Sequence, residues 1–257
     1  MAAAILGDVS DRRFTVGWLY PDLMNIYGDR GNILTLLQRM RWRGWDARLL
    51  ELPKGQDAGF EDVDVFFFGG GQDRDQAIVY DDLLERKAVP LGRAMAEGAA
   101  MLAVCGGYQL LGHYYQTADG ERLPGIGLVD LHTEAGSRRH IGNVVVETDG
   151  LGLAPPSLVG FENHSGRTFL GTGLKPLGRV RVGAGNNGED GLEGLVEGTI
   201  FGTYLHGSLL PKNPHLADRV ILAGLARRRV EVLEPLDDTL EMAAHRRLLE
   251  RELAGRR

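Results

Sequence analysis

Cysteine is nearly absent from this chain of 257 residues, because Cys105 is the only one. A single cysteine excludes an intrachain disulfide, so we expect a protein of the reducing cytoplasm. Long apolar runs are also missing, and none approaches the ~18 residues that a membrane-spanning helix needs. Basic residues are not in excess: the net charge is −6, which argues against a nucleic-acid surface, since such a surface needs a basic stripe.

A phosphate-binding loop of the form Gly-x-x-x-x-Gly-Lys-[Ser/Thr] is absent as well. One segment, Gly183–Gly188, fits Gly-x-Gly-x-x-Gly, but acidic residues and Gly191 follow it rather than a helix. Without a helix after it the pattern is weak, and we interpret it as a turn. We therefore expect no cofactor and no metal ion in this chain, and any ATP-dependent step must take place elsewhere.

The first half of the chain alternates between strand-like and helix-like segments. Apolar, β-rich runs predict strands at Phe14–Tyr20, Ala47–Leu52, Val63–Phe68 and Met101–Val104. Helical spacing predicts helices at Asn32–Met40, Asp75–Gly98 (broken or kinked at Pro90) and Tyr108–Tyr115. This β-α-β-α order predicts an α/β fold with an open, mostly parallel sheet flanked by helices.

The second half is richer in strands. We expect strands at Ile126–Glu134, Ile141–Glu147, Leu158–Glu162, Val180–Val182 and Leu195–Tyr204, and helices at Leu216–Arg228 and Leu240–Arg257. No internal repeat and no linker is evident, so we predict a single domain over residues 1–257. Residues 1–13 are expected to form a loose tail, and residues 236–257 to include the charged C-terminal helix.

Cys105 follows a short apolar run and precedes two glycines and a predicted helix. A lone cysteine is most often a small buried hydrophobe, but Gly106 and Gly107 are poor choices inside a helix or strand. They suit a sharp strand-to-helix turn that exposes one nucleophile at the edge of a sheet. We therefore predict that Cys105 is a catalytic nucleophile.

A thiol is mostly protonated at neutral pH, so this nucleophile needs a base. The chain has seven histidines, and His206 is the strongest candidate. It ends a predicted buried strand, and that end of an open α/β sheet faces the ligand crevice. His113 is expected within the helix that follows Cys105, and His215 near a helix start. The others are expected in turns or surface runs: His132, His140, His164 and His245.

Acyl transfer also requires hydrogen-bond donors for the developing oxyanion. The backbone N–H of Gly106, directly after the nucleophile, is the natural first donor. A second can come from Gly69–Gly71, which follows a neighbouring predicted strand. The other interpretation of these three glycines is a plain tight turn.

Two motifs carry a specific resemblance. Cys-x-Gly-x-Gln at Cys105–Gln109 and Gly-Thr-Tyr-x-His-Gly at residues 202–207 resemble class I glutamine amidotransferases of the cobyric-acid-synthase-like group. Further segments resemble the glutaminase subunits (GatD) of lipid II isoglutaminyl synthases: Tyr27–Asn32, Phe68–Asp73 and Phe161–Arg167. The resemblance runs from about Phe14 to Arg228 and implies the flavodoxin-like architecture of this class.

The resemblance implies a thioester mechanism on free L-glutamine. Cys105 would attack the side-chain amide, with His206 as base and then acid, and the oxyanion would rest on the N–H groups of Gly70 and Gly106. Gln109, one helical turn after Cys105, would help to hold the substrate. Arg139 matches the position that grips glutamine, although the run Arg138-Arg139 leaves the choice open by one residue.

The implied partner is a MurT-type, Mur-ligase-like subunit with which the chain forms a heterodimer. That subunit would bind ATP and Mg²⁺, activate the α-carboxylate of D-glutamate in the lipid II stem peptide, and receive the ammonia. Peptidoglycan synthesis would be the pathway.

The chain departs from the broader class I pattern at one position. Many members carry a glutamate two residues after the histidine, and here that residue is Ser208. Three explanations are open: a Cys–His dyad, another acid of this chain, or an acid from a partner. The resemblance favours the third, with an aspartate from the partner.

Three other functions stay open on the sequence. They are an amidotransferase of another pathway, a different cysteine hydrolase on a related sheet, and a binding scaffold without catalysis. The contexts of Gln109 and His206 argue against the hydrolase, and the presence of both Cys105 and His206 argues against the scaffold.

Overall fold

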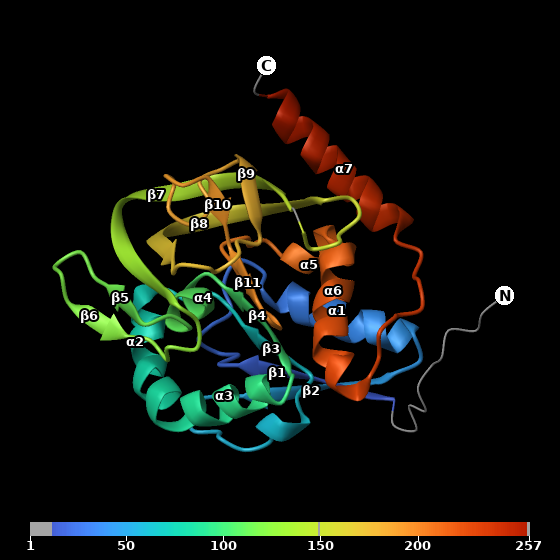
Figure 1. The fold of residues 1–257 in the computed structure, drawn as a ribbon, viewed down its shortest axis with the longest axis horizontal. Helices are drawn as coiled ribbons and strands as arrows, with labels where there is room; N and C mark the ends of the chain where they lie inside the picture. Colours follow the sequence, from blue (N-terminus) through green and yellow to red (C-terminus); the bar gives the residue numbers. More distant parts are fainter. Residues whose placement is uncertain (1–11, 149, 256–257) are drawn as a thin grey trace.

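The computed structural model describes residues 12–148 and 150–255 of the chain. The predicted loose tail therefore lies almost wholly outside the described residues. Two sheets form the framework, and Figure 1 shows the second lying beyond one end of the first. Among the described residues, no helix is both long and apolar enough to cross a bilayer.

The first sheet confirms the predicted open, mostly parallel sheet. Its strand order is β11-β12-β4-β3-β1-β2. The strands span, in that order, Leu195–Glu197, Ile200–Thr203, Ala100–Val104, Val65–Phe68, Arg13–Leu19 and Asp46–Leu52. Every pairing is parallel except that of β11 with β12. All residues of β3, β4 and β12 are buried, as expected for parallel strands that are covered on both faces.

Helices cover both faces of this sheet (Figure 1). The contacts of α1 and α6 with each other and with the strands place them on one face, while α2 and α3 lie on the other. The helices and helical turns span Arg30–Trp42 (α1), Phe60–Asp62 (η1), Asp73–Asp82 (α2), Leu83–Lys87 (η2, a π-helical turn), Ala88–Ala96 (α3), Gly106–Leu110 (α4), Leu209–Lys212 (α5), Pro214–Leu225 (α6), Ala226–Arg228 (η3) and Thr239–Ala254 (α7).

The second sheet is dominated by one long antiparallel pair. Its strands are β10, β9, β7, β5 and β6, with β8 paired to β7. They span Leu192–Glu193, Gly178–Val182, Leu131–Glu147, Tyr114–Gln116, Arg122–Pro124 and, for β8, Ser157–Leu170. An antiparallel bridge between Phe161 and His206 joins β8 to the end of the first sheet. This bridge brings the second sheet to the predicted catalytic histidine.

Several predicted boundaries were wrong. The helix expected over Tyr108–Tyr115 ends at Leu110, and the chain enters β5 at Tyr114. The strand expected over Leu195–Tyr204 is a hairpin of β11 and β12 with Gly198 at φ 57° between them. The two strands expected over Ile126–Glu134 and Ile141–Glu147 are one long strand, β7.

Candidate active site

Four strands of the first sheet end at one place. The segments that follow β1, β3, β4 and β12 contain Asp29, Gly69–Gly71, Cys105 and His206, respectively. The connections from β1 and β3 lead to opposite sides of the sheet, because β2 lies beyond β1 and β4 beyond β3. Open α/β sheets form their ligand crevice at such a point, outside the carboxyl ends of the strands.

Cys105 occupies a sharp turn between β4 and α4. Its backbone has φ 51° and ψ −108°, a conformation that non-glycine residues rarely adopt. The Cys105 N–H donates to Thr203 O at 2.8 Å, and the Gly107 N–H donates to Gly69 O at 3.1 Å. A Cβ on Gly107 would lie 2.4 Å from Phe68 O, so only glycine fits there. The predicted strand-to-helix elbow is present, held by both neighbouring strand ends.

His206 is placed beside the elbow by backbone and side-chain contacts. Its N–H donates to Phe161 O at 2.7 Å, and its imidazole is fully buried. Nδ1 lies 3.2 Å from Asp29 Oδ1, while Nε2 has no hydrogen-bond partner within the part of the chain that the structure describes. Burial opposes the charge on this ring. The charge of Cys105 and the hydrogen bond with Asp29 outweigh it, raising the pKa of His206 to about 10.

The glycine loop after β3 corrects the predicted oxyanion site. The Gly70 N–H already donates to Asp29 Oδ2 at 2.7 Å, so it is not free to stabilise an oxyanion. Gly71 lines the cavity that contains Cys105, and its nitrogen lies 3.1 Å from where a Cβ on Gly106 would be. Gly71 therefore replaces Gly70 as the candidate for the second donor, beside the predicted donor Gly106.

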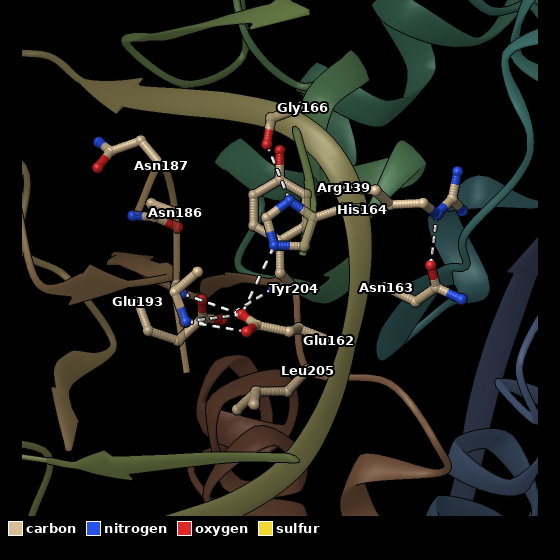
Figure 2. Close-up of polar contacts among 12 residues, drawn as sticks. Arg139, Glu162, Asn163, His164, Gly166, Asn186, Asn187, Glu193, Tyr204 and Leu205 are labelled. Atoms are coloured by element: carbon tan, nitrogen blue, oxygen red, sulfur yellow. Dashed lines mark hydrogen bonds and ion pairs between the residues drawn. The ribbon is translucent and has the colours of Figure 1, made fainter. Parts of the chain in front are cut away.

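A cavity of about 380 Å³ opens over Cys105, a size within the usual range for small-molecule sites. Its charged walls come from Arg74 and Arg139. Arg139 Nε donates to Asn163 Oδ1 at 2.6 Å, and its Nη2 donates to Tyr27 Oη at 3.3 Å (Figure 2 shows the Asn163 contact). A guanidinium in this position suits a carboxylate ligand. Arg139 lines the cavity and Arg138 does not, among the described residues.

Gln109 forms part of the cavity wall one turn after Cys105. Its side chain is buried and held at both ends: Nε2 donates to Tyr204 Oη at 2.9 Å, and Oε1 accepts from Gln76 Nε2 at 3.2 Å. Tyr204 Oη is in turn bonded to Thr168 at 2.7 Å. The carboxamide is thus fixed before any ligand arrives.

A buried polar cluster surrounds Tyr204, the residue that accepts a hydrogen bond from Gln109 (Figure 2 shows the cluster). The His164 ring stacks on Tyr204 with ring centroids 3.7 Å apart, and its Nε2 lies 3.8 Å from Glu162 Oε2. His164 was expected in a turn or surface run, but it is buried in β8 and lines the cavity. It supports the tyrosine that fixes Gln109.

The Gly-x-Gly-x-x-Gly segment binds an anion, but that anion belongs to the chain itself. The N–H groups of Ala184 and Gly185 donate to the Glu162 carboxylate at 2.9 to 3.1 Å (Figure 2). This agrees with its interpretation as a turn and assigns it a structural role next to the site.

Asp29 and Gly71 were not among the predicted site residues. Asp29 is separated from His206 by 177 positions, so no local spacing connects them. Two signals were present: Asp29 lies in the Tyr27–Asn32 segment that carried the family resemblance, and Gly71 lies in the predicted glycine loop.

Comparison with known proteins agrees with this geometry. Residues 15–214 match the model of the CobB/CobQ-like glutamine amidotransferase domain. This chain belongs to that family. The amidotransferase is 39% identical to the Staphylococcus aureus (strain N315) protein named lipid II isoglutaminyl synthase (glutamine-hydrolyzing) subunit GatD, over 92% of the chain and 95% of that protein.

The amidotransferase is also 35% identical to the protein of the same name from Streptococcus pneumoniae (strain ATCC BAA-255 / R6), over 94% of the chain and 89% of that protein. In fold it is similar to a crystal structure described as a glutamine amidotransferase, with a TM-score of 0.56 and 18% identity. That match covers 82% of this chain and 98% of the other. This structural likeness bears on the fold alone.

Proposed function

We propose that this chain is the glutamine-hydrolysing subunit of a lipid II isoglutaminyl synthase. The single observation that carries the proposal is the placement of Cys105 and His206. They follow the adjacent strands β4 and β12. Cys105 lines one cavity with Arg139 and Gln109, and His206 is buried next to Asp29. The near full-length similarity to two proteins named as GatD subunits supports the choice of pathway.

In this proposal Arg139 holds the α-carboxylate of L-glutamine and Gln109 borders its side chain. The Cys105 thiolate attacks the side-chain carbonyl carbon, and the negative charge moves to the carbonyl oxygen between the N–H groups of Gly71 and Gly106. His206 gives its Nε2 proton to the amide nitrogen as the C–N bond breaks, releasing ammonia and leaving a γ-glutamyl thioester.

Water then completes the cycle. His206 accepts a proton from water as the hydroxide oxygen attacks the thioester, and the C–S bond breaks to give the thiolate and the γ-carboxylic acid, which releases its proton to solvent as glutamate. His206 keeps this proton for the next substrate, so atoms and charge balance over the two half-reactions.

We further propose that the ammonia serves a MurT-type, Mur-ligase-like subunit in a heterodimer in the cytoplasm. That subunit would bind ATP and Mg²⁺ and activate the α-carboxylate of D-glutamate in the lipid II stem peptide. Ammonium ion lacks a free electron pair and is not a nucleophile, so ammonia must reach the acceptor before the ammonia is protonated.

The test is ammonia release from glutamine by the chain, alone and with its co-purified partner. Replacement of Cys105 by Ala or Ser is expected to abolish release while far-UV circular dichroism and partner binding stay unchanged. Undiminished glutamine hydrolysis by either variant would overturn the proposal. A wild-type complex that cleaves peptides and leaves glutamine untouched would replace it with a different cysteine hydrolase.

A further inference from the structure

Ser208 occupies the position where many class I amidotransferases carry an acid, and it contacts the Gly28–Asn32 segment instead. Its hydroxyl donates to Gly28 O at 2.6 Å. A Cβ on Gly31 would lie 2.2 Å from Ser208 Oγ, so the two segments of the chain are in close contact. Two residues further, the Leu210 N–H donates to Asn32 Oδ1 at 2.8 Å. The segment that follows β12 thus fixes the segment that follows β1.

Asp29 lies in the middle of this fixed loop. Both Asp29 and His206 are fully buried, and both oxygens of the carboxylate are used. Oδ1 is 3.2 Å from His206 Nδ1, and Oδ2 accepts the Gly70 N–H at 2.7 Å. A buried carboxylate without such partners would be strongly unfavourable, so these contacts account for its presence here.

We propose that Asp29 is the positioning acid of the Cys105–His206 pair, supplied by this chain rather than by a partner. The inference rests on the proposed glutaminase function. An acceptor at Nδ1 keeps the proton on that nitrogen, which orients the ring and directs Nε2 toward Cys105. Asp29 does not touch the substrate and acts through His206.

The second oxygen of Asp29 gives it another task. By binding the Gly70 N–H it fixes the glycine loop, so that the next residue, Gly71, lines the cavity beside Gly106. One carboxylate therefore sets the orientation of the base and of the proposed oxyanion donors. Removing it would disturb both, and neither loss requires a change in glutamine binding by Arg139.

The groups that face His206 define what its ionisation depends on. Cys105 faces it from the end of β4 and Asp29 from the loop after β1. Tyr27 lies edge-on to the ring with centroids 5.1 Å apart, and Arg139 bonds to the Tyr27 hydroxyl. From β8, the backbone of Phe161 binds His206. Of these, only Asp29 contacts Nδ1.

The experiment compares Asp29→Asn with Asp22→Asn in the full chain, assayed alone and with its co-expressed partner. Asp22 lies in the same connection but is exposed, so it loses the same charge away from the site. For Asp29→Asn we expect kcat to fall roughly 10- to 1,000-fold, as for loss of a residue that orients a general base. KM should change less than about threefold, since no substrate contact is lost.

Two readouts separate positioning from a structural role. At neutral pH, Cys105 should be alkylated by iodoacetamide more slowly in Asp29→Asn than in the wild type, because the thiolate–imidazolium pair is weakened. The rate of alkylation should be unchanged in Asp22→Asn. Asp29→Glu, which restores the charge, should recover part of kcat. If Asp29→Asn does not fold, the ¹⁵N shifts of His206 in the wild-type chain decide: a protonated, hydrogen-bonded Nδ1 supports the proposal.

Folded Asp29→Asn with wild-type kcat and alkylation, or a neutral His206 with its proton on Nε2, would overturn the inference. Those results would direct the search to an acid of the partner. They would leave glutamine hydrolysis by Cys105 intact. An inactive wild-type enzyme in which Asp29→Asn still alters alkylation would remove the proposed substrate and keep the assignment of Asp29.

Discussion

Most residues of this site are held in place by hydrogen bonds to neighbouring elements. The backbone of Cys105 is bonded to β12, and that of His206 is bonded to β8. Gln109 is fixed by Gln76 and Tyr204. Such preorganisation reduces the rearrangement needed when substrate binds. Arg139 differs, because its side chain is exposed and reaches the cavity from β7.

Arg139 gives the first prediction. Arg139→Gln should raise KM for glutamine about 10- to 100-fold, because a charge-assisted hydrogen bond is worth about 1.5–3 kcal/mol. kcat should change little, since the arginine holds substrate and transition state alike. Steady-state kinetics would measure both. Arg138→Gln is the matched control, being exposed and outside the cavity lining; an equal rise in KM for it would contradict the assignment.

At this scale the sequence indicated Cys105 as the candidate nucleophile and His206 as the candidate base, because each lies in a local motif. Gly70 was assigned by analogy, and only the structure shows that Asp29 takes its N–H. Asp29 itself could not be paired with His206 before β1 and β12, which β3 and β4 separate, were known to end at the same edge of the first sheet. Contacts across 177 positions depend on strand order rather than on spacing.

At the scale of elements, the elbow between β4 and α4 depends on close backbone approach. α4 has only five residues, and its second glycine packs on the end of β3. The expected helix to Tyr115 was too long because the apolar residues after Leu110 were assigned to helix. They instead lead into β5, which pairs with β6 and β7. A tertiary pairing of this kind has no short-range signal.

Two glycines test this account of the elbow. Gly107→Ala should destabilise the fold by roughly 1–3 kcal/mol and lower kcat, because its Cβ would lie 2.4 Å from Phe68 O. Gly92→Ala in α3 faces open space and should stabilise by about 0.5–1 kcal/mol without affecting activity. Urea unfolding compares the two, and a harmless Gly107→Ala would show that the elbow tolerates a side chain.

For the whole molecule, the strand order decides which segments meet. The alternation of strands and helices was enough to predict the parallel sheet, because each buried strand reads as a continuous apolar run. The second sheet was not predicted as a separate layer. Its strands β7 and β8 are partly exposed and carry many polar residues, so their length and partners could not be read from the apolar pattern.

The free energy of unfolding should depend on pH through the charge on His206. Its pKa is raised from 6.5 to about 10 in the folded chain, so the protonated ring stabilises the fold. This contribution is complete below pH 6.5 and is lost as the pH rises through about 10. The difference in free energy of unfolding between wild type and His206→Gln should therefore shrink from neutral pH to above pH 10. A difference that does not vary with pH would refute the raised pKa.

The most direct test of the central claim is the covalent intermediate. Wild-type protein mixed with glutamine, quenched in acid and measured by intact mass spectrometry, should carry one glutamyl group, and peptide mapping should place it on Cys105. The adduct should be absent from Cys105→Ala and should accumulate when thioester hydrolysis is slowed. Ammonia release from glutamine at an undiminished rate by Cys105→Ala, with no adduct in the wild type, would contradict the account.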